Sequence, residues 1–156
     1  MKNVLFYFPL LSLLCVSLGC DPGSQTKSHA VPGGPAARIA AVQRIIQRSG
    51  QLPGTIQQAE IAEQQRGDGV LGPSDFTTFI RIEVNAADIG KWKAAFQRAR
   101  EKKDFVTPHD PVKWWLSKED FDKLELYEPK SLFGRTNGWV GFSSDQKTIY
   151  VVTYTM

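Results

Sequence analysis

A nearly strict alternation of apolar and polar residues over positions 76–86 does most to limit how this chain can fold. One set is mainly apolar and the other mainly polar: Phe76, Thr78, Ile80, Ile82, Val84 and Ala86 alternate with Thr77, Phe79, Arg81, Glu83 and Asn85. Successive side chains of a strand point to opposite faces, so this period of two predicts a β-strand with one buried face. The chain must therefore cover at least one side of a sheet with apolar groups.

An amphipathic helix is predicted directly after this strand. Asn85 is a residue type that caps helix N-termini, and Asp88 carries the charge that the positive end of a helix favours. An apolar stripe then repeats at helical spacing through Ile89, Trp92, Phe96 and Ala99. At this spacing the indole of Trp92 is expected to lie in the core.

Two further strands are predicted over residues 139–142 and 148–155, around the polar turn 144–147. The order strand, helix, irregular segment, strand, strand indicates that residues 73–156 form a domain of the α+β class. The economical arrangement is a small, mainly antiparallel three-stranded sheet (β-α-loop-β-β) with one helix packed on a face.

A helix is also predicted near the start of the segment 36–72. Pro35 suits a first helical turn, and Ser49-Gly50 ends the helix. The apolar residues between them repeat at helical spacing: Ile39, Val42 and Ile46.

A second helix is predicted from Thr55 to about Arg66, because Thr55-x-x-Gln58 matches a capping box. Its apolar stripe is thin and consists of Ile56, Ala59 and Ala62. We expect residues 36–72 to form a helical hairpin or a mobile helical segment. If the hairpin docks, it is expected to cover the sheet face on which Phe79, Tyr150 and Tyr154 fall.

Residues 67–72, GDGVLG, match the G-x-G-x-x-G spacing of dinucleotide-binding loops. That motif needs a strand before it and a helix after it, so that the helix N-terminus meets the pyrophosphate. The predicted order here is the reverse. We therefore interpret this segment as a hinge loop.

The N-terminus has the pattern of a secretory signal. Lys2 is followed by residues 4–18, which carry no charge and would span about 22 Å as a helix. A hydrocarbon core needs roughly 20 apolar residues, so this run is short for a membrane span. A basic start, a short apolar run and small residues before a break are typical of a signal peptide.

The end of that signal, Val16-Ser17-Leu18-Gly19-Cys20, resembles a bacterial lipoprotein signal peptide. The departure from the family's pattern is Ser17, where leucine is usual. The resemblance implies cleavage after residue 19, lipidation of the Cys20 thiol, and attachment to the extracytoplasmic face of a bacterial cell membrane. An ordinary signal peptide is the alternative.

Cysteine usage agrees with lipidation, because Cys15 leaves with the signal and the mature chain then has one cysteine and no possible internal disulfide. Residues 20–35, rich in Pro, Gly and Ser, are predicted to be a flexible tether.

Charge argues against a nucleic-acid partner. The formal net charge is +3, and removal of Lys2 with the signal lowers it to +2. Residues 74–156 hold 13 basic and 12 acidic side chains. A nearly neutral domain has no electrostatic attraction to nucleic acid. The expected partners are the bilayer, through acylated Cys20, and an envelope protein or glycan.

The segment 104–135 is long for a connection and rich in aromatic residues, so it is the candidate binding surface. The candidate residues are His109, Trp114, Trp115, Tyr127, Arg135 and Trp139. Adjacent tryptophans point in different directions, so one of Trp114 and Trp115 is a candidate for exposure. The alternative is that both pin this irregular segment to the sheet through bonds from their N–H groups to backbone carbonyls.

Enzyme signatures are missing from the sequence. His109 is the one histidine outside the tether, so no multi-histidine zinc site is expected, and no catalytic residue, metal or cofactor is predicted. The function predicted is a membrane-anchored, non-catalytic binding or interaction module. The alternatives are a small envelope hydrolase that uses His109 and a structural spacer without a ligand.

Overall fold

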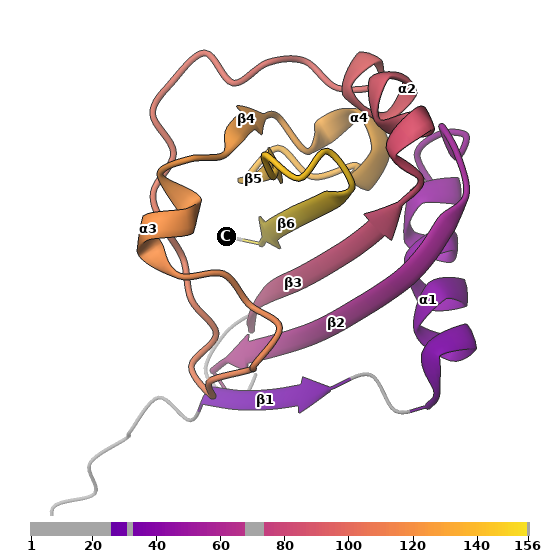
Figure 1. The fold of residues 1–156 in the computed structure, drawn as a ribbon. Helices are drawn as coiled ribbons and strands as arrows, with labels where there is room; N and C mark the ends of the chain where they lie inside the picture. The colour runs from indigo at the N-terminus through magenta and orange to yellow at the C-terminus, as the bar shows by residue number, and fades with distance from the viewer. Residues whose placement is uncertain (1–25, 31–32, 68–73, 156) are drawn as a thin grey trace, which may run out of the picture.

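Six strands form one antiparallel sheet in the order β1-β2-β3-β6-β5-β4 (Figure 1). The computed structural model describes residues 26–30, 33–67 and 74–155. The strands are β1 Thr26–Ala30, β2 Ile56–Arg66, β3 Asp75–Val84, β4 Glu125–Tyr127, β5 Gly138–Phe142 and β6 Thr148–Tyr154. The helices are α1 Pro35–Gln47, η1 Ala86–Asp88, α2 Ile89–Ala94, α3 Lys118–Phe121 and α4 Lys130–Phe133. The α+β class is confirmed, and the sheet is larger than the three strands predicted.

The alternating segment forms β3, which pairs with β2 on one side and β6 on the other. Ile80, Ile82 and Val84 are buried on one face, and Phe79 is buried on the opposite face. The two predicted C-terminal strands are confirmed as β5 and β6.

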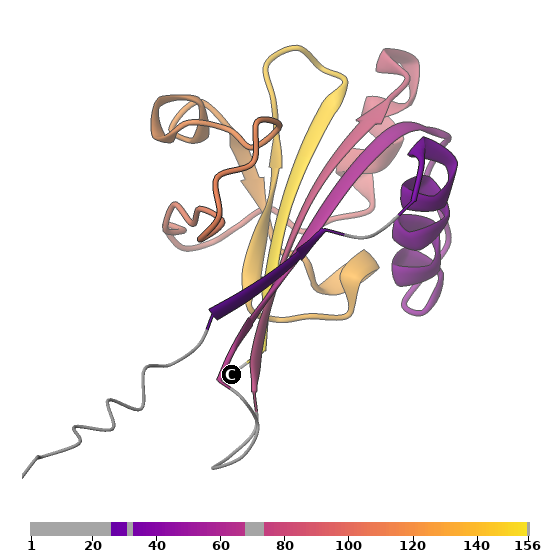
Figure 2. The same ribbon diagram turned by 90° about the horizontal axis from the view of Figure 1, so that it is seen from below.

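One face of the sheet, the helical face, carries Ile80, Ile82 and Val84 and is covered by α1, α2 and α4 (Figure 2). Val42 and Ile46 of α1 and Trp92 of α2 are fully buried against it. The first helix predicted from the sequence is therefore confirmed, with Pro35 in its first turn.

The other face, the loop face, carries Phe79, Trp139 and Val152 and is covered by the segment 105–124. Figure 2 shows this segment on the side of the sheet away from α1. The expectation that a helical hairpin from residues 36–72 covers this face is wrong, since α1 packs on the helical face.

The predicted second helix is wrong, because Ile56–Arg66 is strand β2. A register shift between Ile56 and Gln58 adds one residue to the strand at this point. As a result Ile56 and Ala59 join the helical-face cluster although they are three residues apart, while Ala62 belongs to the loop face. The bulge therefore imitates helical spacing, and pairing with β3 overrides the helix preference of Gln, Glu and Ala.

The predicted tether is also wrong in part, because Thr26–Ala30 pair with the second half of β2 as strand β1. The GDGVLG segment interpreted as a hinge begins at Gly67, after β2, and its residues 68–72 lie outside the described residues. The signal, Cys20 and residues 21–25 lie outside them as well.

The predicted helix after β3 is shorter than its apolar stripe. The Asn85 side chain accepts a hydrogen bond from the Ala87 amide, as a cap does, but α2 ends at Ala94. Beyond it the chain pairs with β4: Ala99 N donates to Leu126 O, and Glu128 N donates to Gln97 O. Ile89, Trp92 and Phe96 are still buried as predicted.

Candidate functional site

The six residues predicted to form one binding surface do not lie together. Trp139 is 1% exposed on the loop face, and Tyr127 is 8% exposed on the helical face. Tyr127 pairs with Val140 in the register of β4 and β5, one position from Trp139. Neighbouring positions of a strand point to opposite faces, which separates the two aromatic rings. Their assignment to a common exposed surface is wrong.

Trp115 holds the irregular segment onto the loop face. Its Nε1–H donates to Val106 O at 3.0 Å, and its ring contacts Phe79 and Tyr150 edge-on, with centroids 5.1 and 5.6 Å away. Trp139 Nε1–H likewise donates to Asp104 O at 3.0 Å. The alternative in which a tryptophan pins the segment through a backbone carbonyl is therefore observed for Trp115, and Trp139 makes the same kind of bond.

Trp114 and His109 lie at the outside of this segment. Trp114 is half-buried with its ring edge-on to Trp115, and His109 is exposed. The His109 side chain makes no hydrogen bond or ion pair within the described part of the chain. A histidine base needs a partner that orients it, so the surroundings of His109 do not build a catalytic pair.

Tyr127 belongs to a charged cluster that stabilises the edge of the sheet. Burial and the hydrogen bond that its hydroxyl donates to Glu125 Oε1 (2.9 Å) raise the pKa of Tyr127. The bond from Lys93, the bond from Tyr127 and nearby Arg98 lower the pKa of Glu125. Both groups are fixed in one protonation state near neutral pH.

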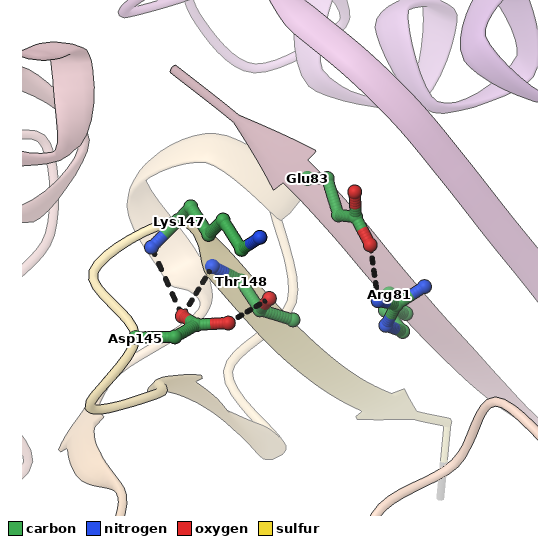
Figure 3. Close-up of polar contacts among 5 residues, drawn as sticks. All are labelled: Arg81, Glu83, Asp145, Lys147 and Thr148. Atoms are coloured by element: carbon green, nitrogen blue, oxygen red, sulfur yellow. Dashed lines mark hydrogen bonds and ion pairs between the residues drawn. The ribbon is translucent and has the colours of Figure 1, made fainter. Parts of the chain in front are cut away.

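A second polar group closes the turn between β5 and β6 (Figure 3). Asp145 accepts bonds from Lys147 N at 3.0 Å, Thr148 N at 2.9 Å and Thr148 Oγ1 at 2.6 Å. Burial opposes the charge, but these three bonds outweigh it and lower the pKa of Asp145. On β3 nearby, Arg81 and Glu83 pair with each other. The carboxylates of Asp145 and Glu83 are thus bonded within the fold.

A recess with unpaired charged groups lies on the helical face, at the end of the sheet opposite this turn. This recess, which we call the arginine pocket, has a volume of about 280 Å³. Its apolar lining consists of Ile45, Ile80 and Phe133. The polar residues around it are Arg48, Ser49, Glu63, Thr78, Arg135 and Thr153.

Two chain turns meet at the arginine pocket. After α1 the amides of Ser49 and Gly50 both donate to Ile46 O, which closes the helix end. After α4 the chain turns at Gly134, whose φ is 64°. A Cβ atom on Gly134 would lie 2.5 Å from Ser49 Oγ, so the absence of a side chain lets the two turns touch. This contact brings Arg48 and Arg135, the neighbours of Ser49 and Gly134, to one recess.

The charged groups of the arginine pocket have no partners among the residues that the structure describes. The side chains of Arg48, Arg135 and Glu63 are exposed. Among the described residues, none of the three makes a hydrogen bond or an ion pair. A cation following a helix C-terminus is favoured by the helix dipole, which explains the place of Arg48 but leaves its guanidinium donors free. The pocket therefore offers two forked donors beside an apolar floor.

Two other recesses are less suited to bind an anion. One of about 200 Å³ is lined by Glu101, Lys102, Lys103 and Asp104, so its two acidic residues balance its two basic ones. A hollow of about 170 Å³ beside His109 is lined by Pro108, Pro111, Val112 and Trp115 with Thr107 and Leu116, and no charged residue lines it. Within the described ranges, no three His, Cys, Asp or Glu side chains gather as metal ligands. In the same part of the chain no helix is long and apolar enough to cross a membrane.

No protein family, no curated protein and no solved structure matches this chain.

Sequence reasoning selected Arg135 but missed the rest of the arginine pocket. Arg48 and Ser49 were recognisable as a helix end, which by itself indicates no site. The sequence predicts a helix around Glu63, so its position on β2 directly beside Thr78 of β3 is not predicted. No signal in the sequence indicated that the ends of α1 and α4 touch.

Proposed function

We propose that this protein is a lipid-anchored, non-catalytic binding module of a bacterial envelope, and that the arginine pocket binds an anionic group of its ligand. The anchor is inferred from the resemblance of residues 16–20 to a lipoprotein signal peptide. The observation that carries the binding site is the pair of unpaired guanidinium groups, Arg48 and Arg135, beside an apolar floor.

Arginine favours anions of a particular shape. Its planar fork binds a carboxylate or a phosphate through two parallel N–H···O bonds. The hydroxyls of Ser49, Thr78 and Thr153 provide further donors, and Ile45, Ile80 and Phe133 add a small apolar surface for another part of the same ligand. A ligand that joins one phosphate or carboxylate to an apolar group fits this chemistry best.

The anchor is tested by the mass of the mature N-terminus. We expect the chain to begin at Cys20 and to carry acyl chains on its thiol. An unmodified N-terminus at any other residue would contradict the anchor without affecting the binding site.

The binding site is tested by thermal unfolding of the full-length protein in detergent with inorganic phosphate, glycerol phosphate or acetate. A ligand of the folded state raises the midpoint as RT ln(1 + [L]/Kd), which is about 2.7 kcal/mol at one hundred times Kd. We expect phosphate compounds to raise the midpoint of the native protein and to have no effect on Arg135→Gln.

Arg100→Gln is the matched control, because Arg100 is an exposed arginine outside the pocket. It should respond to phosphate as the native protein does. An equal shift in Arg135→Gln and Arg100→Gln would exclude the arginine pocket as the site.

A further inference from the structure

The short distance between Cys20 and the sheet limits where the domain can lie. Strand β1 begins at Thr26, so only residues 21–25 separate it from the acylated cysteine of the proposed function, on which this inference rests. An extended chain advances at most about 3.6 Å per residue, so Thr26 lies within roughly 22 Å of Cys20. The end of the sheet where β1 begins therefore stays within reach of the bilayer surface.

An exposed phenylalanine lies at this same end. Phe76 is 44% exposed, and within the described residues no other large apolar side chain is exposed. It pairs with Gln65 in the register of β3 and β2, and Gln65 pairs with Lys27 of β1. Two strand spacings of about 4.8 Å place the Phe76 backbone about 10 Å from that of Lys27, the second residue of β1.

The arginine pocket begins next to Phe76 on the helical face. Thr78, which lines the pocket, is the next residue of β3 that points to the same face, about 7 Å along the strand. Arg135 follows α4 just before β5, whose first residue Gly138 pairs with Thr153. Figure 2 shows the start of β3 and the end of β6 at one end of the sheet, which β1 approaches with its first residues.

We propose that this end of the sheet rests on the bilayer that holds the acyl chains, with Phe76 in the headgroup region and the arginine pocket around the phosphate of a lipid headgroup. Aromatic side chains favour the membrane interface, and basic side chains close to the surface are attracted to anionic lipids. A lipid joins a phosphate to apolar chains, which matches the unpaired guanidinium groups and the apolar lining of the pocket.

The charges at this end of the sheet nearly cancel. Direct contacts of Phe76 and the pocket arginines with the lipids, rather than a long-range positive field, should therefore hold the domain on the bilayer. Arg66 and Asp75 are both exposed and are register partners of β2 and β3 at this end, so their opposite charges cancel. The negative charge of Glu63 likewise offsets the charge of one arginine of the pocket. The orientation should therefore depend on Phe76 and on the pocket arginines individually.

Nitroxide labels on single cysteines test this orientation in the full, acylated protein. The mature chain has no free thiol once Cys20 is acylated, so an introduced cysteine is labelled alone. The exposed residue Asp75 provides a label beside Phe76, as Asp75→Cys. Ser144→Cys provides the matched control, in the exposed turn at the opposite end of the sheet.

The measurement is the collision rate of each label with a water-soluble nickel complex, in vesicles of phosphatidylethanolamine and phosphatidylglycerol. We expect the label at 75 to be shielded severalfold relative to the label at 144. Phe76→Ser, Arg48→Gln and Arg135→Gln, each combined with Asp75→Cys, should raise its collision rate, and Arg100→Gln should not. Circular dichroism of each variant checks that the fold is retained.

The possible outcomes distinguish a lipid phosphate from a soluble phosphate, and the membrane orientation from the proposed binding site and anchor. Equal collision rates at 75 and 144 in the acylated protein would overturn the membrane orientation. If glycerol phosphate still stabilises that protein through Arg135, the proposed binding site stands and its ligand is a soluble phosphate. A mature N-terminus without acyl chains would overturn the anchor and this orientation together.

Discussion

On the helical face the sheet is covered by α1, α2 and α4, whereas on the loop face it is covered by residues 105–124, whose one helix has four residues. Both covers contribute aromatic and aliphatic side chains, which are mostly buried on the helical face and mostly half-buried on the loop face. They differ in how the backbone of the cover finds its hydrogen bonds.

A helix satisfies most of its own backbone groups, but an irregular segment needs partners from elsewhere. On the loop face two of these partners are indoles: Trp115 binds Val106 O and Trp139 binds Asp104 O. On the helical face the buried Nε1 of Trp92 has no hydrogen-bond partner among the described residues. The tryptophans of the loop face therefore act as polar anchors, and Trp92 acts as apolar filling.

The largest effect is expected where a substitution damages the sheet beneath both covers. A Cβ atom on Gly138 would lie 1.9 Å from Val152 O, and the φ of Gly138 is 117°. Because the obstacle is backbone, Gly138→Ala should destabilise the protein by about 3 kcal/mol or more. Chemical denaturation measures this, and near-native stability would contradict the register of β5 and β6.

Replacing tryptophan by phenylalanine tests the difference between the faces directly. Trp139→Phe loses ring volume and the bond to Asp104 O, so we expect a loss of about 2–3 kcal/mol. Trp92→Phe loses a similar volume but removes an unsatisfied donor, so we expect about 1 kcal/mol or less. Equal losses in denaturant titrations would show that the two indoles do not differ in role.

A smaller effect is expected where the irregular cover touches the sheet. A Cβ atom on Gly141 would lie 2.4 Å from Cδ1 of Leu124, which is a flexible side chain. Gly141→Ala should therefore cost about 1–2 kcal/mol, and shortening Leu124 to Val in the same chain should recover part of that loss. If the stability losses of the two substitutions simply add, the shorter side chain does not relieve the clash, and the contact of Leu124 with Gly141 is not as described.

The smallest effect concerns the turn drawn in Figure 3. The pKa of Asp145 is lower in the folded protein than its ordinary value of 3.8, so its carboxylate stabilises the fold above that pH. This contribution is lost as the pH falls through the lower folded value. Asp145→Asn should cost about 1 kcal/mol at neutral pH and less once the pH is below the folded pKa of Asp145. A cost independent of pH would contradict the role of the charge.

The sequence predicted those elements whose burial follows a regular period. The alternation through Ile80 and Ile82, the stripe through Val42 and Ile46, and the cap at Asn85 are all confirmed. Each of these signals lies within a few residues of the structure that it predicts.

The prediction failed where pairing between distant segments decides the structure. Strand β2 consists largely of helix-favouring residues and has a bulge after Ile56, so its local pattern indicated a helix. Strand β1 has no apolar period of its own and depends on β2 for its backbone partners. The arginine pocket was not predicted for the same reason, because it requires contact between Ser49 and Gly134, which are 85 positions apart in the sequence.

The position of β6 has a consequence for how the protein folds. This strand lies between β3 and β5 near the middle of the sheet, yet it is later in the sequence than every other strand. Its pairing with β3 joins residues about 70 positions apart, and such long loops make folding slow. Until β6 is present, β3 has no partner on its inner side and the two halves of the sheet cannot join. The complete sheet therefore forms only after the C-terminal strand is available to join β3 to β5.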